Sequence, residues 1–314
     1  MQDRTVIAHI SDLHVTPLAG MMPRDLNIKR TLGLLNYHRS RKSVHRSDVA
    51  DRLVADMLST RPDHIAVTGD LCNIGLPGEY AAALSWLERI GPPDAVTVVP
   101  GNHDIYTRLG HHPGVELWRA YMQSDSQGAA LRGSGAAERG FPIVRHVGCA
   151  ALVGLNSAIE TRPFVAAGRL GMRQLEALAQ LLRALRQQAL ARIVLIHHPP
   201  LVGQAPARRG LSDAAALAEV LRDEGAELIL HGHDHRDSLH WAEGMMARIP
   251  VIGIASGSAG RRHKGEPLAR YNLITVRRTD DGWSVEVNGR GLASPDGGVV
   301  DIERHVLTPP MPSA

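Results

Sequence analysis

Histidines gather near residue 233 in a pattern that could bind a metal ion. The stretch ILHGHDH follows a short apolar run and carries His231, His233 and His235. Apolar runs of this length that are bounded by glycine are typical of buried strands. Side chains two residues apart on an extended chain point the same way, so His233 and His235 can face one small volume. Clustered neutral imidazoles form transition-metal sites; the alternative is a run of surface histidines.

Four other expected strands, at residues 5–10, 64–68, 95–99 and 193–196, also end in polar side chains. In open α/β sheets, ligands bind outside the carboxyl ends of the strands, so all five clusters should meet there. Oxygen and imidazole ligands without thiolate suit Mn, Fe, Zn or Co. The clusters are Asp12 and His14; Asp70; Asn102, His103 and Asp104; His197 and His198; and His233 and His235.

This set of donors is larger than one ion needs and matches a two-metal site. Two ions about 3.5–4 Å apart can clamp a phosphoryl group and hold an activated water for in-line attack. A carboxylate can bridge two cations, and Asp70 stands alone at the end of its strand. The donors therefore predict a two-metal site for phosphoryl chemistry, with Asp70 as the bridge.

Alternating strands and helices must position these side chains. Helices are expected at residues 47–59, 79–90, 172–190 and 212–222, and further strands at 143–147, 150–155, 250–255, 271–276 and 283–287. This order predicts an α/β protein with much parallel sheet and a final antiparallel hairpin. No linker separates the polar clusters, so we expect one domain over residues 1–307 and a loose tail over 308–314. Residues 125–140, rich in Ser, Gly and Ala, are expected to form a flexible loop.

The composition is that of an ordinary globular protein. The 314 residues are 44% hydrophobic and 21% charged, and only 4% are aromatic. A net charge of +3 and few aromatic rings for stacking argue against a nucleic-acid partner. Only two cysteines, Cys72 and Cys149, occur, and the sequence has neither a signal-peptide pattern nor an apolar run of bilayer length. These features favour a cytoplasmic location.

The combined motifs carry a family resemblance. D-x-H (Asp12, His14), G-D (69–70), G-N-H-D (101–104), a lone His197 and G-H-x-H (232–235) together resemble the calcineurin-like metallophosphoesterase superfamily. Within it, the chain is most similar to the bacterial cyclic-nucleotide phosphodiesterase-like (class III) branch. The resemblance covers residues 6–255. It implies a four-layered α/β/β/α sandwich with mixed sheets.

The resemblance also implies a role for each motif residue. Two ions of Fe, Mn or Zn would be bound, and a metal-bound hydroxide would attack the phosphorus. His103 would stand outside the metal shell, bind the phosphate and protonate the leaving oxygen. His198 remains an alternative to His197 as a ligand, while His231 and Asp104 are expected to support the ligands. One ion would be held by Asp12, His14 and His235, and the other by Asn102, His197 and His233, with Asp70 as the bridge.

Residues 24–46 form a basic insertion, with seven Lys or Arg against one acid. Three interpretations are open: a solvated helix face, a wall for an anionic substrate, or an amphipathic patch for acidic lipid. A second basic loop at residues 261–264 could reach the mouth of the site.

The function we expect is a dinuclear metal phosphodiesterase acting on a small phosphodiester, with a cyclic nucleotide as one candidate. One alternative is a hydrolase of lipid-linked phosphoesters that uses the basic insertion. The other is a catalytically silent scaffold with the same fold. Peripheral membrane contact and homo-oligomerisation are left open as partner interactions.

Overall fold

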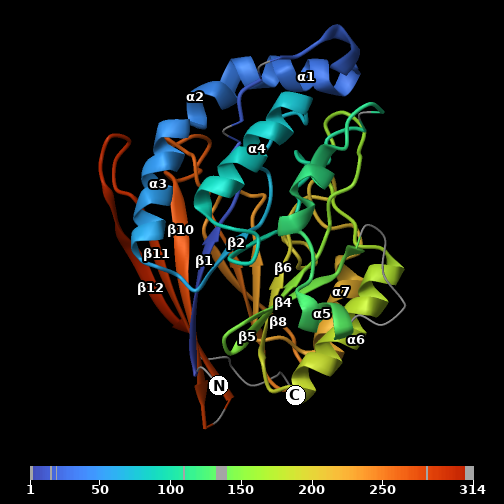
Figure 1. Ribbon diagram of the computed structural model, residues 1–314, viewed down its shortest axis with the longest axis vertical. Coiled ribbons are helices and arrows are strands. Elements are labelled where there is room, and N and C mark those ends of the chain that lie inside the picture. The colour runs from blue at the N-terminus through green and yellow to red at the C-terminus, as the bar shows by residue number, and fades with distance from the viewer. Residues whose placement is uncertain are drawn as a thin grey trace.

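The computed structural model describes residues 3–14, 16–18, 20–108, 110–131, 140–280 and 282–307. Within these residues, two six-stranded mixed sheets pack face to face, and helices cover the outer face of each sheet (Figure 1). This architecture confirms the four-layered α/β/β/α sandwich. The expected tail at 308–314 lies outside the described residues.

The first sheet has the strand order β12-β11-β10-β1-β2-β3. Its parallel part is β1 (Arg4–Ile10), β2 (His64–Val67) and β3 (Val96–Val98). The antiparallel part is β10 (Arg270–Thr279), β11 (Gly282–Leu292) and β12 (Val299–Leu307), and the pairing of Thr279 with Gly282 confirms the predicted hairpin. Helices α3 (Ser47–Ser59) and α4 (Pro77–Ile90) lie on its outer side (Figure 1).

The second sheet has the order β4-β5-β6-β7-β9-β8. Parallel strands β5 (Ala150–Gly154), β6 (Ala191–Leu195), β7 (Leu228–His231) and β9 (Ile249–Gly253) lie between antiparallel edge strands β4 (Ile143–Val147) and β8 (Ser238–Ala242). Helices α6 (Met172–Gln187) and α7 (Ala214–Glu224) cover it. The leucines of α6 are buried at helical spacing, because they form the face that packs on the sheet.

One hydrophobic cluster joins the two sheets. It contains Ile7 and Val67 from the first sheet and Ile193 and Leu228 from the second, all at most 1% exposed. The parallel strands are buried on both faces, which is why they read as continuous apolar runs. Packing the sheets together brings the carboxyl ends of β1, β2, β3, β6 and β7 to one end of the molecule.

The basic insertion folds into short helices at that same end. It contains a 3₁₀ turn (Pro23–Asp25), α1 (Ile28–Asn36), a π-helical turn (Tyr37–Arg41) and α2 (Lys42–Val44). Asn27 caps α1 by accepting a hydrogen bond from the Arg30 N–H. No helix in the described part of the chain is long and apolar enough to cross a bilayer.

The expected flexible loop at 125–140 is in part a helix. Its first half forms α5 (Ser126–Leu131), and the Gly128 N–H donates to the carboxylate of Asp125 at 2.6 Å. The Ser- and Gly-containing composition concealed this short helix because the capping contact, and not periodicity, stabilises it. Residues 132–139 lie outside the described part. A 3₁₀ segment (Gly114–Tyr121) precedes α5. The sequence pattern did not predict this segment or the edge strands β8 and β12.

Candidate metal centre

Unusual backbone geometry marks the ends of the strands that carry the predicted ligands. A positive φ is uncommon for residues other than glycine, and such strain clusters at functional sites. The Asp12 N–H donates to Gly69 O at 2.9 Å and the His14 N–H to Asp70 O at 3.0 Å, so adjacent strand ends hold one another. The residues with positive φ are Asp12 (54°), His14 (46°), Asp70 (57°), His233 (74°) and His235 (53°).

A first group of donors consists of Asp12, His14 and His235, whose ligand atoms all lie within 4.8 Å of one another. His235 Nε2 is 3.3 Å from Asp12 Oδ1 and 3.4 Å from His14 Nε2. Three side chains from two distant segments therefore share one small volume.

A second group consists of Asp70, His197 and His233, also within 4.8 Å. Asn102 Oδ1 joins it at 3.2 Å from His197 Nε2, and His233 Nδ1 lies 3.2 Å from the same nitrogen. Asp70 Oδ2 lies 3.4 Å from His197 Nε2 and 3.7 Å from His14 Nε2. This oxygen stands between the two groups, which is the position a bridging carboxylate needs.

Hydrogen bonds on the outer side of the rings orient lone pairs toward the centre. His14 Nδ1 lies 2.8 Å from Cys72 O, and His197 Nδ1 lies 2.7 Å from Thr68 O. A carbonyl partner requires a proton on Nδ1, so the neutral ring carries its lone pair on Nε2, which faces the other donors. The second nitrogen of His233, Nε2, is buried without a partner. These residues fit two cations, and metal ligands in proteins show the same outer hydrogen bonding.

Electrostatics favour positive charge in the same volume. Burial raises the pKa of Asp70, but the nearby His197 and His103 outweigh it and hold this pKa well below its usual range. Burial lowers the pKa values of His197 and His235, yet Asp70 and Asp12 respectively raise each to about 9. Each aspartate is thus compensated by an imidazolium, and a bound cation would replace those protons.

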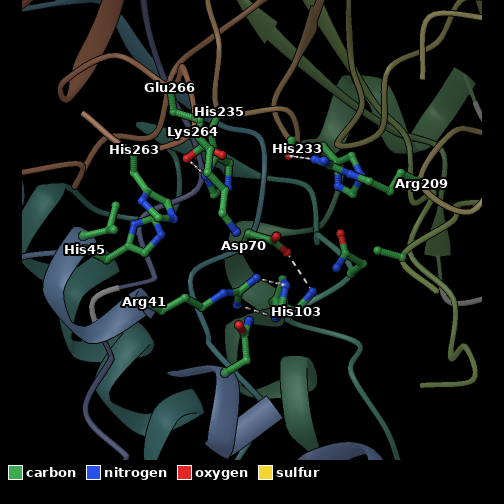
Figure 2. A pocket seen from close by; sticks show the side chains of 14 residues that line it. Arg41, His45, Asp70, His103, Arg209, His233, His235, His263, Lys264 and Glu266 are labelled. Carbon is green, nitrogen blue, oxygen red and sulfur yellow. Dashed lines mark hydrogen bonds and ion pairs between the residues drawn. The ribbon is translucent and has the colours of Figure 1, made fainter. Parts of the chain in front are cut away.

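His103 lies beside the donor groups and belongs to neither. Its backbone N–H donates to Asp70 Oδ1 at 2.7 Å (Figure 2), and its ring Nδ1 forms a hydrogen bond with Asn73 O. The ring stacks on Tyr106 at 5.4 Å and meets the His14 ring edge-on at 5.0 Å. Burial and then Arg41 lower the pKa of His103 to about 3. With Nδ1 bound to a carbonyl, Nε2 is the atom that can serve a substrate.

The basic insertion supplies one wall of this site. Arg41 Nη2 lies 2.7 Å from His103 Nε2, and Nη1 lies 3.0 Å from Nδ1 (Figure 2). Within the described residues, the guanidinium contacts this ring and approaches Asn73 O, and no carboxylate forms an ion pair with it. His45 follows four residues later, with its ring 4.7 Å from that of His14. The sequence predicted that the insertion could form a wall of the site, but it did not distinguish Arg41 or His45 from the other residues of the insertion.

Other cations of the insertion have structural roles. Arg30 is 2% exposed and donates to the carbonyl oxygens of Asp25, Ile74, Gly75 and Thr107. Lys29 donates to Tyr106 O at 3.0 Å and to Thr161 Oγ1 at 2.9 Å. Some cations of the insertion, such as Arg30 and Lys29, therefore hold neighbouring loops in place, whereas Arg41 lines the pocket.

Two of the supporting histidines face away from the donors. His198 Nδ1 lies 2.8 Å from Ser157 Oγ and its Nε2 lies 3.2 Å from Ala166 O. His231 Nδ1 lies 2.9 Å from Gly232 O and its Nε2 lies 3.1 Å from Gln204 Nε2. Both rings are fully engaged outside the donor groups, so the geometry places His197, and not His198, among the donors.

Asp104 organises the backbone beneath the site. Its carboxylate accepts four hydrogen bonds, from the N–H groups of Asp70, Leu71, Cys72 and Gly101, at 2.8–3.0 Å. Burial and the charge of Asp70 raise its pKa to about 7, and the N–H groups oppose this shift. The side chain thus fixes the two loops that carry Asp70 and Asn102.

Replacing Asp104 by asparagine should destabilise the protein. The amide nitrogen cannot accept hydrogen bonds, so buried N–H groups lose their acceptor, at a cost of about 3 kcal/mol in the free energy of unfolding. Urea denaturation at pH 7 measures this, with exposed Asp51→Asn on α3 as the control, expected within about 0.5 kcal/mol of the wild type. Equal urea midpoints for the two variants would contradict the role given to Asp104.

An open pocket of about 220 Å³ leads to both donor groups. Asp70, His103, His233 and His235 form its floor, and Arg41 lies on one side (Figure 2). The remaining wall includes residues that sequence reasoning missed, among them Arg209 and Glu266; Glu266 Oε2 lies 3.3 Å from His235 Nδ1. Lys264 of the second basic loop also lines the pocket, as that loop's position after β9 had suggested.

The family of the chain follows from a comparison with known families. Residues 5–237 match the family model described as calcineurin-like phosphoesterase. The chain belongs to the calcineurin-like phosphoesterase family. The match spans every strand end that carries a donor, from Asp12 to His235. Family membership makes the two donor groups the candidate ligands of a dinuclear metal centre.

Three proteins with a similar sequence or structure have low sequence identity to this chain. A probable cyclic nucleotide phosphodiesterase from Synechococcus sp. is 28% identical over 178 residues, which are 56% of this chain and 58% of that protein. The chain thus matches little more than half of that relative's length. Among solved structures, a dimetal phosphatase from Danio rerio has a TM-score of 0.55 at 16% identity and covers 96% of this chain and 99% of its own. A purple acid phosphatase from yellow lupin seeds has a TM-score of 0.54 at 13% identity, covering 96% and 53%. These two structures share the fold.

Proposed function

We propose that this protein is a dinuclear metal phosphodiesterase that hydrolyses a small phosphodiester, with a cyclic nucleotide as one candidate. One observation carries the proposal: two groups of donors share Asp70 Oδ2, and His103 and Arg41 lie beside them in one pocket. The name of the Synechococcus relative supports a diester substrate.

The residues suggest how catalysis would be divided. Asp12, His14 and His235 would hold one ion, and Asn102, His197 and His233 the other, with Asp70 shared between them. Bound ions would polarise the phosphoryl oxygens and lower the pKa of an attacking water. Their identity among Fe, Mn and Zn stays a prediction from donor chemistry.

His103 and Arg41 would act on the substrate directly. The Asn73 carbonyl holds the Nδ1 proton of His103 and leaves Nε2 directed at Arg41, 2.7 Å away. An anionic phosphoryl oxygen can enter between guanidinium and imidazole and bind both. The negative charge of a bound phosphoryl group would favour the imidazolium form of His103, in which a second proton, taken up from solvent, lies on Nε2. The imidazolium can donate that proton to the leaving oxygen and return to the neutral ring, because an alkoxide leaves poorly without a proton near neutral pH.

The test is hydrolysis by protein loaded with Mn or Fe. Bis(p-nitrophenyl) phosphate should be cleaved faster than p-nitrophenyl phosphate, and His103→Ala should lower kcat for the diester by about 10²–10⁴-fold. His240→Ala, an exposed histidine on β8, is the matched control and should keep full activity. Loaded protein that cleaves no diester would refute the proposal and favour a silent scaffold.

Two further features of the proposal rest on chemistry. Cys72 and Cys149 are buried and free, which is compatible with the cytoplasmic location that we propose.

Lipid-linked phosphoesters are the second substrate class to be screened, because the basic insertion lines the pocket through Arg41 and His45.

A further inference from the structure

An aromatic side chain stands out in solvent near the mouth of the pocket. Phe164 is 84% exposed, the highest fraction among the large hydrophobic residues described. Its φ of 66° lies in the left-handed region, which a bulky side chain rarely adopts. Burial does not offset this strain. Residues held in strained conformations without a packing reason point to function.

The loop of Phe164 is attached to both the pocket and the basic insertion. Ala166, two residues further on, lines the pocket. Thr161 Oγ1 accepts a hydrogen bond from Lys29 of α1 and donates one to Val165 O. The loop that follows β5 and helix α1 thus lie side by side at one end of the molecule (Figure 1).

Helix α1 exposes apolar side chains at the same end. Ile28 is 77% exposed and Leu35 is 56% exposed, and a spacing of seven residues places them on one helix face. Figure 1 shows α1 as the outermost element there. We call Ile28, Leu35 and Phe164 the apolar rim.

The charge around the apolar rim is positive. Exposed cations in the same segments include Arg39, Lys42 and Arg162. Arg208, also exposed, lies in the neighbouring loop after β6, and its carbonyl accepts a hydrogen bond from the Ala166 N–H. The acids of these segments are engaged: Asp25 pairs with His111, and Glu160 pairs with Arg108. Apolar side chains among cations are the combination that binds anionic bilayers, where each part contributes separately.

We infer that the apolar rim docks this protein on an anionic lipid bilayer, so that the pocket opens toward phosphoester headgroups in the membrane. The inference rests on the proposed phosphoesterase site for its substrate class, a lipid phosphoester. Docking itself needs no catalysis and is measured separately.

The test is co-sedimentation of the full chain with vesicles of phosphatidylcholine containing about one third phosphatidylglycerol. The wild type should bind these vesicles, bind pure phosphatidylcholine weakly, and lose affinity as salt is raised. Phe164→Asn should bind about tenfold more weakly, and the pair Arg39→Gln and Lys42→Gln about fivefold or more. Asparagine tolerates the left-handed region, so Phe164→Asn should unfold at an equal or higher temperature.

Met246→Ser is the matched control. Met246 is 75% exposed in the turn between β8 and β9. This turn lies at the end opposite the pocket, because β9 runs parallel to β7 and ends beside His231. The control should bind vesicles like the wild type.

The outcomes separate the inference from the proposed function. Equal binding of anionic vesicles by Phe164→Asn, Met246→Ser and wild type, or no binding by any, would overturn docking. Loss of hydrolysis of soluble cyclic nucleotides by Phe164→Asn, with vesicle binding intact, would also overturn it and make Phe164 a base-stacking residue. Vesicle binding by a protein that cleaves no phosphoester would refute the proposed function and leave docking supported.

Discussion

Replacing Asp70 by asparagine is expected to lower kcat for phosphodiester hydrolysis on the order of 10³-fold and to reduce bound metal below two ions per chain. Asp70 Oδ2 lies between His14 Nε2 and His197 Nε2, so it is the one donor that both groups share. An amide oxygen carries no net charge and binds a second cation poorly. The loss should therefore exceed that of any single neutral ligand.

Asp70→Asn also serves to separate metal binding from folding. Metal content by mass spectrometry and kcat at saturating Mn are the two measurements. Asp51→Asn, an exposed aspartate on α3, is the control and should retain both ions and full activity. An Asp70→Asn protein that keeps two ions and wild-type kcat would show that the carboxylate does not bridge.

Replacing Arg41 by methionine is expected to lower kcat/KM for the diester by about 10²-fold, chiefly through KM. The guanidinium contacts His103 and, among the described residues, has no carboxylate partner, so it is available to an anionic phosphoryl oxygen. Burial lowers the pKa of Arg41, as expected for a cation deprived of water. Hydrogen bonds between charged groups in such surroundings are strong.

A change in the pH profile should accompany this loss. Arg41 is one of the causes that lower the pKa of His103, since two cations repel. Removing the guanidinium favours the imidazolium, so the pKa of His103 rises and the limb of kcat/KM that requires its proton moves to higher pH. A shift to lower pH would contradict the contact.

Two variants sharpen the Arg41 test. Arg41→Lys keeps the charge but not the planar fork and should recover only part of the activity. Arg39→Met, an exposed arginine two residues earlier in the same turn, is the matched control and should leave hydrolysis of soluble diesters unchanged. Equal losses for Arg39→Met and Arg41→Met would mean that only the net charge of the insertion matters.

Local chemistry explains why the donor set could be predicted. Each donor follows a buried strand, and strands that are buried on both faces can be recognised in the sequence as apolar runs. Parallel strands of one sheet end at the same edge, so Asp12, Asp70 and Asn102 had to approach one another. His233 and His235 lie beyond the end of β7 and both have positive φ, so the extended-chain geometry expected for them was wrong, and their loop carries them into different donor groups. The final hairpin could also be predicted, because its two strands are adjacent in the sequence.

Long-range packing decided what the sequence left open. The position of each cationic side chain in residues 24–46 depends on partners that are distant in the sequence. Arg30 donates a hydrogen bond to the carbonyl of Thr107, and Arg41 contacts the ring of His103. Composition alone treats these two arginines as equivalent. Strained backbone at the donors, the four N–H groups around Asp104 and the exposure of Phe164 likewise exist only once the loops are packed. By itself, the sequence determined the candidate metal donors and the sheets that carry them, because both depend on short segments. The substrate wall and the apolar rim were decided by the tertiary structure, because they form only where distant loops meet.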